Sequence, residues 1–411
     1  MVILIVLLII AAALWMLFVY GTWFFTFHNS DARKNAAVDL PASAQYDPFR
    51  REMKALVDAM HEVPFEEVRI RAYDGTELYG RYYHARNNEP VDAQIEVRQR
   101  TENHERTQGK EHAAGYSEER AAADSKECGA NDRGNAGYES SVQPLQIMFH
   151  GYRGAALRDM AGAHKIARTH GIDSLVVDQR AHENSGGHTI AFGIKEREDC
   201  KRWCEYAAER FGLSKPVIIS GVSMGAATVL MAADLDLPSN VVGIAADCGY
   251  SSPKDIICDV IRQKKLPVWL FWPAAYLGEL FFGHVNLLAT SAKKAVSRTK
   301  LPILIIHGTE DRFVPCRMAE EIAAAYRGGM DKAGAGDHGA CGDGACGDGA
   351  RNDVAGRRNP ECADAEVKRQ SVQVEIFEGA PHGLSFLVDE KRYTETELAF
   401  IEKCNNKVIG Y

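Results

Sequence analysis

The longest apolar stretch lies at the N-terminus, where no charged residue occurs from Val2 to Phe27. A helix of this length spans a hydrocarbon core of about 30 Å, and the Trp, Tyr and Phe residues near its end are typical of a membrane interface. We therefore expect residues 1–28 to form a single-pass membrane anchor. A cleaved signal peptide is the alternative, since Ser30 and Ala32 resemble a small-x-small site, but the stretch is longer than an h-region and lacks a basic n-region.

The chain becomes polar after this stretch. The first basic side chains, Arg33 and Lys34, follow it, so the positive-inside rule favours a cytoplasmic position for the rest of the chain. Residues 29–63 are predicted to be a connector, with a helical stretch at 48–62.

From residue 64 onward, short β-branched apolar runs alternate with stretches of helical spacing. The runs at 68–72 and 78–84 flank Asp74-Gly75, a strong hairpin signal. The later runs are 145–150, 174–178, 216–221, 241–247, 301–307 and 372–377, and the helical stretches include 158–170, 195–211, 224–233 and 318–326. Buried parallel strands joined by crossover helices have this pattern. The sequence thus predicts an α/β domain over 64–411, with a mostly parallel eight-stranded sheet, an antiparallel start and helices on both faces.

Three segments interrupt this alternation. Residues 87–143 and 328–370 are poor in apolar residues, and the second contains a tandem ACGDG repeat, so both are predicted to be flexible surface insertions. Residues 251–298 contain an apolar stretch that is too short and interrupted for a second membrane helix. We expect a small helical cap there, over the site, with ordinary helix packing as the alternative.

A candidate nucleophile lies in residues 216–227, which read PVIISGVSMGAA. The segment is an apolar run, then Gly221-Val222-Ser223-Met224-Gly225, then a helical stretch, which is the G-x-S-x-G pattern in its strand-turn-helix context. The glycines permit a close approach of strand and helix around a strained serine. The N-terminus of the helix would stabilise negative charge on a substrate oxygen. The pattern predicts Ser223 as the nucleophile.

A serine hydroxyl needs a base within hydrogen-bond reach and a carboxylate that orients the base. Asp311 follows the run at 301–307, and His382 follows the last run, which gives the chain order Ser, Asp, His. Asp247, which ends another run, is the rival acid. We prefer Asp311 because its loop follows the later strand, and we predict Ser223, Asp311 and His382 as a catalytic triad.

The predicted oxyanion hole draws on the segment His150-Gly151-Tyr152-Arg153-Gly154, directly after an apolar run. A loop at this place donates one backbone N–H, and the residue after the nucleophile donates another. Tyr152 and Met224 are the predicted donors.

The segments HGYRG, DQRAHENSGGH, GVSMGA, HGTEDRFVP and GAPHG together resemble the bacterial alpha/beta-hydrolase group of membrane or cell-surface hydrolases, similar to the family that includes Bem46-like proteins. The resemblance covers about residues 68–403, apart from both insertions. It implies the α/β-hydrolase fold and its triad, and it is uninformative about the substrate. This chain has Glu183 where that group commonly has a glycine, which leaves the detailed shape of that loop open.

Composition narrows the choice of partners. The formal net charge of −8 and the pI near 6.0, without a basic stripe interleaved with aromatic residues, argue against nucleic acid. The ten cysteines are scattered and do not fix the redox compartment. Since no HExxH or cysteine-pair ligand spacing occurs, we expect no metal and no cofactor.

Structural roles are expected for the other conspicuous polar residues. His150 and His307 are predicted to be hydrogen-bonded within loops, His182 and His188 to be surface histidines, Asp178 and Arg180 to tie loops together, and Cys200 and Cys204 to be packed free thiols.

The sequence therefore favours a serine hydrolase that cleaves a carboxylic ester or thioester through an acyl-enzyme. The apolar cap and the anchor favour a lipophilic acyl substrate. A serine peptidase or amidase using the same triad is one alternative, and a non-catalytic membrane-anchored scaffold is the other.

Overall fold

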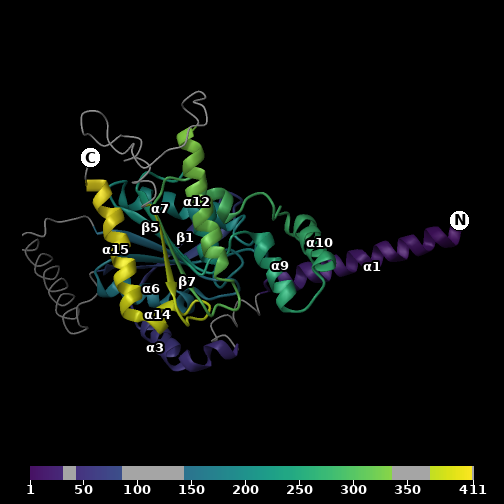
Figure 1. Ribbon diagram of the computed structural model, residues 1–411, viewed down its shortest axis with the longest axis horizontal. Helices are drawn as coiled ribbons and strands as arrows, with labels where there is room; N and C mark the ends of the chain where they lie inside the picture. Colours follow the sequence, from purple (N-terminus) through teal and green to yellow (C-terminus); the bar gives the residue numbers. More distant parts are fainter. Residues whose placement is uncertain (31–42, 86–142, 336–370, 410–411) are drawn as a thin grey trace, which may run out of the picture. The chain divides into compact units, whose positions relative to one another are not determined.

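The computed structural model describes residues 1–30, 43–85, 143–335 and 371–409. It is built on a sheet that lies among the helices (Figure 1), with eight strands in the order β1-β2-β4-β3-β5-β6-β7-β8. The first two strands form an antiparallel hairpin, β2 pairs antiparallel with β4, and the other neighbours are parallel. The strands are β1 (Glu66–Arg71), β2 (Glu77–Tyr83), β3 (Leu145–Phe149), β4 (Asp173–Asp178), β5 (Val217–Val222), β6 (Val241–Asp247), β7 (Ile303–Gly308) and β8 (Val372–Phe377). The predicted sheet is confirmed.

Helices cover both faces of this sheet because its strands are apolar on both sides. In β3, for example, Ile147 and Phe149 belong to one buried cluster and Met148, between them, to the other. The first face carries α7 (Glu196–Phe211), α8 (Met224–Ala232), α11 (Ala292–Val296) and α12 (Arg317–Ala335). The second carries α3 (Arg50–His61), α5 (Ala156–Asp159), α6 (Ala161–Thr169), α14 (Ser385–Val388) and α15 (Glu390–Ile409).

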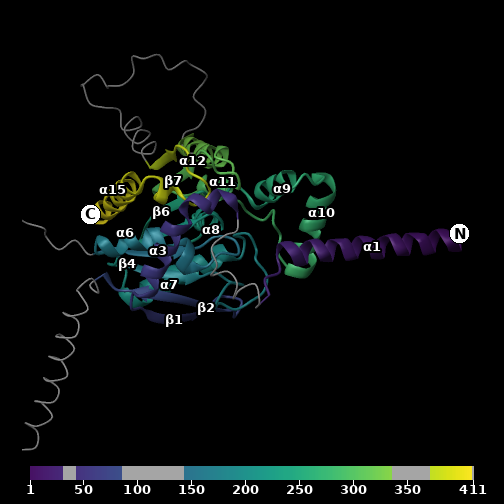
Figure 2. The ribbon, with the colours of Figure 1, turned by 90° about the horizontal axis from the view of Figure 1, so that it is seen from below.

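The N-terminal apolar run forms one helix, α1 (Val2–Thr26), which is long and apolar enough to cross a membrane by length and composition. Its last turns pack against α10 (Val268–Gly278) and η3 (Glu279–Gly283), which form the cap together with α9 (Pro253–Gln263); α11, at the end of the predicted cap segment, packs on α8 and α12 instead. Both views show α10 beside α1 (Figures 1 and 2). The anchor predicted for residues 1–28 is thus partly embedded in the folded domain.

Several predicted boundaries differ in the structure. The single helix expected over 158–170 is broken at Met160, whose φ of −102° and ψ of 5° end α5 and begin α6. The insertion expected from residue 328 begins as helix, since α12 continues to Ala335. A Cβ at Gly329 would overlap the carbonyl of Ser297, so this glycine lets α12 pack closely there.

The connector predicted for 29–63 contains η1 (Ala44–Phe49) and α3, which corresponds to the helical stretch expected at 48–62, and α3 packs against η1, α5 and α6. Residues 31–42, nearly all of the insertion at 87–143, and the rest of the second insertion with its ACGDG repeat lie outside the described residues.

Candidate active site

Ser223 occupies the turn between β5 and α8. Its φ of 56° and ψ of −112° are strained for a residue with a side chain, and its backbone N–H donates to the carbonyl of Asp247 at 2.9 Å. Glycines make this turn possible. A Cβ at Gly225 would overlap the carbonyl of Phe149, and one at Gly221 would overlap the backbone of Gly225. The local pattern thus presents a serine hydroxyl directly before the N-terminus of a helix.

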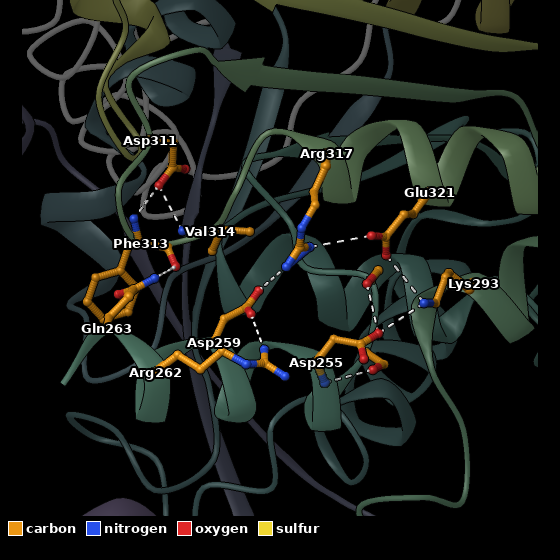
Figure 3. Close-up of polar contacts among 12 residues, drawn as sticks. Asp255, Asp259, Arg262, Gln263, Lys293, Asp311, Phe313, Val314, Arg317 and Glu321 are labelled. Atoms are coloured by element: carbon orange, nitrogen blue, oxygen red, sulfur yellow. Dashed lines mark hydrogen bonds and ion pairs between the residues drawn. The ribbon is translucent and has the colours of Figure 1, made fainter. Parts of the chain in front are cut away.

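The three predicted triad residues form one chain of hydrogen bonds. Nε2 of His382 lies 2.9 Å from Oγ of Ser223, and Nδ1 of His382 lies 2.7 Å from Oδ2 of Asp311. The other carboxylate oxygen of Asp311 accepts the backbone N–H groups of Phe313 and Val314, each at 2.8 Å (Figure 3). The loop after β7 therefore holds the carboxylate in one orientation, and the carboxylate holds the imidazole.

Asp311 and His382 each favour the charged form of the other. Burial alone would lower the pKa of His382, but the Asp311 carboxylate raises it above its ordinary value of 6.5. Burial would likewise raise the pKa of Asp311, but His382 and His307 together bring it well below its usual range. His307 lies against the same oxygen as His382, with its Nε2 3.4 Å from Oδ2 of Asp311. Asp311 is therefore ionised at neutral pH and stabilises an imidazolium.

The rival acid, Asp247, is placed differently. Its Oδ2 accepts the hydroxyl of Tyr393 at 3.2 Å, and burial raises its pKa to about 6. Asp311, not Asp247, makes the hydrogen bond to His382.

Cys248 also lies beside this pair, and ligand atoms of Cys248, Asp311 and His382 are all within 4.8 Å of one another. Such a group can in principle hold a metal ion, but burial raises the pKa of the Cys248 thiol, whereas a metal needs the thiolate. His382 and Asp311 also share the hydrogen bond between their potential ligand atoms. The cluster therefore fits an acid–base pair with a neighbouring thiol better than a metal centre.

The loop after β3 is held by hydrogen bonds to two side chains. Asp159 accepts the N–H of Gly151 at 2.9 Å, and His182 accepts the N–H of Arg153 through Nε2 at 3.0 Å. Tyr152 lies between these two fixed residues and lines a cavity together with Ser223. Met224, the other predicted oxyanion donor, is the first residue of α8 and is fully buried.

The prediction of a surface role for His182 was wrong. The side chain is fully buried, and its Nδ1 contacts the carbonyl of Arg180 at 2.8 Å. Polar neighbours in the sequence suggested exposure, whereas the fold places this loop over the segment that carries Tyr152. His188, in contrast, is exposed as predicted.

Other polar residues have the structural roles expected of them. Asp178 pairs with Arg81 at 2.7 Å, and Arg180 binds both carboxylate oxygens of Asp199 at 2.6 Å. Glu183, at the position where the resembling group commonly has a glycine, adopts a positive φ of 36° and accepts the N–H of Ala156 at 2.8 Å. The loop thus keeps a backbone shape that suits glycine, and gains a bond to the start of α5.

The remaining expected roles also agree with the structure. His150 is buried and accepts the N–H of Gln179 at 2.9 Å, and His307 contacts the carbonyl of Val314 at 2.8 Å. Cys200 and Cys204 are buried free thiols on α7.

Two cavities meet at Ser223. One, of about 670 Å³, is mainly apolar and lies between α1, α9 and α10. The other, of about 450 Å³, extends past His382 toward Tyr46, Arg158 and Asp159. An ester carbonyl at Ser223 could therefore direct one substituent into an apolar space and the other toward polar side chains.

The cap is hydrogen-bonded to the loop that carries Asp311. Gln263 at the end of α9 donates to the carbonyl of Phe313 at 3.2 Å, and Arg317 of α12 pairs with both Asp259 and Glu321 (Figure 3). This network joins the loop that holds Asp311 to the cap that forms one side of the apolar cavity.

Solved structures with the same fold include an esterase, Pf2001 of Pyrococcus furiosus, at a TM-score of 0.51 and 16% identity, over 84% of this chain and 93% of that chain. The alpha/beta hydrolase GrgF of a Penicillium species matches over 84% of this chain and 100% of that chain, at a TM-score of 0.46 and 13% identity. At such identities the likeness concerns the fold alone, and the chain has the α/β-hydrolase fold.

Among curated proteins, the uncharacterized protein YqkD of Bacillus subtilis is 26% identical over 159 residues, which are 38% of this chain and 52% of that protein. The match thus spans about half the length of the relative. No protein-family model matches the chain.

Proposed function

We propose that this protein with an α/β-hydrolase fold is a membrane-anchored serine hydrolase that cleaves a carboxylic ester or thioester. Ser223 Oγ attacks the carbonyl carbon while His382 Nε2 takes its proton, and Asp311 orients the imidazole and stabilises its charged form. The backbone N–H groups of Tyr152 and Met224 bind the oxyanion. His382 then protonates the leaving alcohol or thiol, and water, activated by the same histidine, releases the acid.

One observation carries this proposal: a continuous hydrogen-bonded chain joins Ser223, His382 and Asp311, and it starts from a serine held at strained backbone angles. A structural serine has no need of this strain or of an imidazole whose other nitrogen is held by a carboxylate. The apolar cavity at Ser223 supports an acyl ester over a peptide, because a peptide backbone needs polar partners along its length.

The length and composition of α1 support membrane anchoring, and its packing against the cap supports retention of the helix over signal-peptide cleavage. The resemblance to Bem46-like hydrolases is part of the same proposal and rests on the five motifs.

Labelling with a fluorophosphonate tests for an activated serine. We expect the purified full chain to be labelled, and Ser223→Ala and His382→Ala to lose the label. Ser297→Ala is the matched control, because Ser297 hydrogen-bonds to the carbonyl of Lys294 and lines neither cavity. Equal labelling of wild type and Ser223→Ala would refute the assignment of the nucleophile, and no labelling of folded wild type would favour the scaffold.

A comparison of p-nitrophenyl acyl esters with peptide p-nitroanilides then separates the ester from the amide function. We expect turnover of the esters. Turnover of the anilides alone would replace the esterase proposal with a peptidase or amidase.

A further inference from the structure

The last three turns of α1 are part of the packing of the folded domain. Val19, Trp23 and Phe27 are buried, and Trp23 donates its indole N–H to Glu279 of the cap at 3.0 Å. A Cβ at Gly278 would lie 2.7 Å from Cβ of Trp23, so the two helices cross at close range. Burial raises the pKa of Glu279 to about 9, so this contact buries a neutral carboxyl at pH 7.

The C-terminal end of α1 also holds the loop that carries the predicted oxyanion donor. The Tyr152 hydroxyl donates to the carbonyl of Thr26 at 2.6 Å, and the Arg153 guanidinium donates to the carbonyls of Phe25 and His28 at 2.8 and 3.2 Å. Carbonyls at a helix C-terminus have no hydrogen-bond donor within the helix. Tyr152 and Arg153 therefore supply donors to backbone carbonyls at the end of α1. The end of the anchor is thereby fixed beside Ser223.

Between this helix and the cap lies the apolar cavity that reaches Ser223. Phe18, Gly21 and Thr22 line it from α1, and Ile257 and Val260 line it from α9. Its volume of about 670 Å³ is within the range of about 300–1,000 Å³ that is usual for small-molecule sites. One wall of the cavity is therefore made by the same helix that the membrane would hold.

The helix and the cap around the cavity expose large apolar side chains. The N-terminal half of α1 exposes almost every apolar side chain, and Phe25 is 69% exposed at its other end. On the cap, Trp269 is 78% exposed and Phe281 is 56% exposed. Large aromatic residues with this exposure, next to an apolar helix, are typical of the interface region of a bilayer.

We infer that α1 forms a wall of an acyl-binding site, and that the substrate is an ester or thioester of a long acyl chain that lies between α1 and α9. This inference rests on the proposed hydrolase function. The carbonyl is at Ser223, the acyl chain fills the larger and more apolar cavity, and the leaving alcohol or thiol points into the second cavity, toward Arg158 and Asp159. Each methylene that leaves water strengthens binding about fourfold, so a long chain is selected over a short one.

Gly21 offers a direct test, because it lines the cavity and a Cβ built there meets no atom within 4 Å. The Cβ of a new side chain therefore has room, and the indole of Gly21→Trp is expected to occupy cavity space. We expect it to lower the ratio of kcat/KM for p-nitrophenyl laurate to that for p-nitrophenyl butyrate by about tenfold or more. Leu17→Trp is the matched control, since Leu17 is exposed on the same helix and does not line the cavity, and it should leave the ratio at the wild-type value.

Covalent trapping tests the same inference in the unaltered chain. A long-chain fluorophosphonate with a diazirine in the middle of its chain is first attached to Ser223 and then photolysed. We expect cross-links in the peptide that contains residues 18–26 or in α9. Cross-links confined to residues 43–56 or to α14, which line the other cavity, would overturn the inference even if Gly21→Trp failed to fold.

The acyl ester could come from the bilayer or from water. Two substrates separate these sources in wild type reconstituted into phosphatidylcholine vesicles: a diacylglycerol in the same vesicles and palmitoyl-CoA added outside. Turnover of either, with a loss of about tenfold or more in Gly21→Trp, supports the acyl site and identifies the source. If Gly21→Trp does not reduce turnover, the acyl-site inference is overturned but the proposed hydrolase function stands. If wild type is not labelled by the fluorophosphonate, the proposed hydrolase function itself is refuted.

Discussion

Replacement of Asp311 with asparagine is a stringent test of the proposed triad, because the surrounding bonds dictate how the new side chain lies. The Asp311 oxygen that accepts the N–H groups of Phe313 and Val314 keeps that place as the amide oxygen. The amide NH₂ then faces Nδ1 of His382. A donor at that position makes Nδ1 an acceptor. The imidazole proton then lies on Nε2, the nitrogen that faces the Ser223 hydroxyl.

An imidazole with its proton on Nε2 cannot take the proton of the serine. We therefore expect kcat/KM to fall by about 10³- to 10⁴-fold, which corresponds to about 4 to 5.5 kcal/mol of transition-state stabilisation. Hydrolysis of a p-nitrophenyl ester measures the rate, and circular dichroism checks that the variant is folded.

The pH profile gives a second readout with a defined sign. The base form of His382 is the active form, and Asp311 raises its pKa above 6.5, so wild-type activity should rise with pH through an apparent pKa above that value. Loss of the carboxylate charge lowers the pKa of His382. The residual activity of Asp311→Asn should therefore rise at lower pH than that of wild type.

Asp247→Asn is the matched control, because Asp247 is also buried but binds Tyr393, and burial raises its pKa to about 6. We expect its kcat/KM to change by less than about tenfold. A larger loss in Asp247→Asn than in Asp311→Asn would show that the acid had been wrongly assigned and would refute the reasoning.

Three further predictions concern residues outside the proposed triad. Gly225→Ala should lower the free energy of unfolding by about 3 kcal/mol or more, because its Cβ would overlap the carbonyl of Phe149. Denaturant unfolding measures this free energy, and a smaller loss would contradict the prediction. His182→Ala removes the acceptor of the Arg153 N–H, so kcat should fall about tenfold with little change in KM. Steady-state kinetics measures both constants, and a change in KM alone would contradict the prediction. Glu279 has a pKa raised to about 9, so wild-type stability should fall as the pH rises from about 5 toward 9, and Glu279→Gln should remove that part of the pH dependence of Tm.

Local patterns were sufficient to predict the sheet and to select Ser223, Asp311 and His382, which the fold brings within hydrogen-bond distance of one another. Each strand of the parallel part is a short apolar run, and Ser223 lies in a strand-turn-helix segment whose two glycines are required by direct contacts. Asp311 and His382 each follow a strand, and neighbouring parallel strands bring their carboxyl ends to one edge of the sheet.

Long-range contacts could not be predicted in the same way. An apolar helical run has the same sequence signature whether its side chains meet lipid or protein, so the burial of Trp23 and Phe27 was not visible in the pattern. His182 was missed because its partner, Arg153, is 29 residues away and the bond goes to a backbone group that any residue provides. No sequence signal would have found either contact.

The packing of α1 has a mechanical consequence for the anchored protein that we propose. A domain on a flexible tether can tumble and sample any distance from the membrane within the reach of the tether. Here the helix is fixed to the cap through Trp23 and Glu279 and to the loop of Tyr152 through its terminal carbonyls. The tilt of one helix in the bilayer would then set both the height and the direction of the active-site entrance, and bilayer thickness would become a determinant of catalysis.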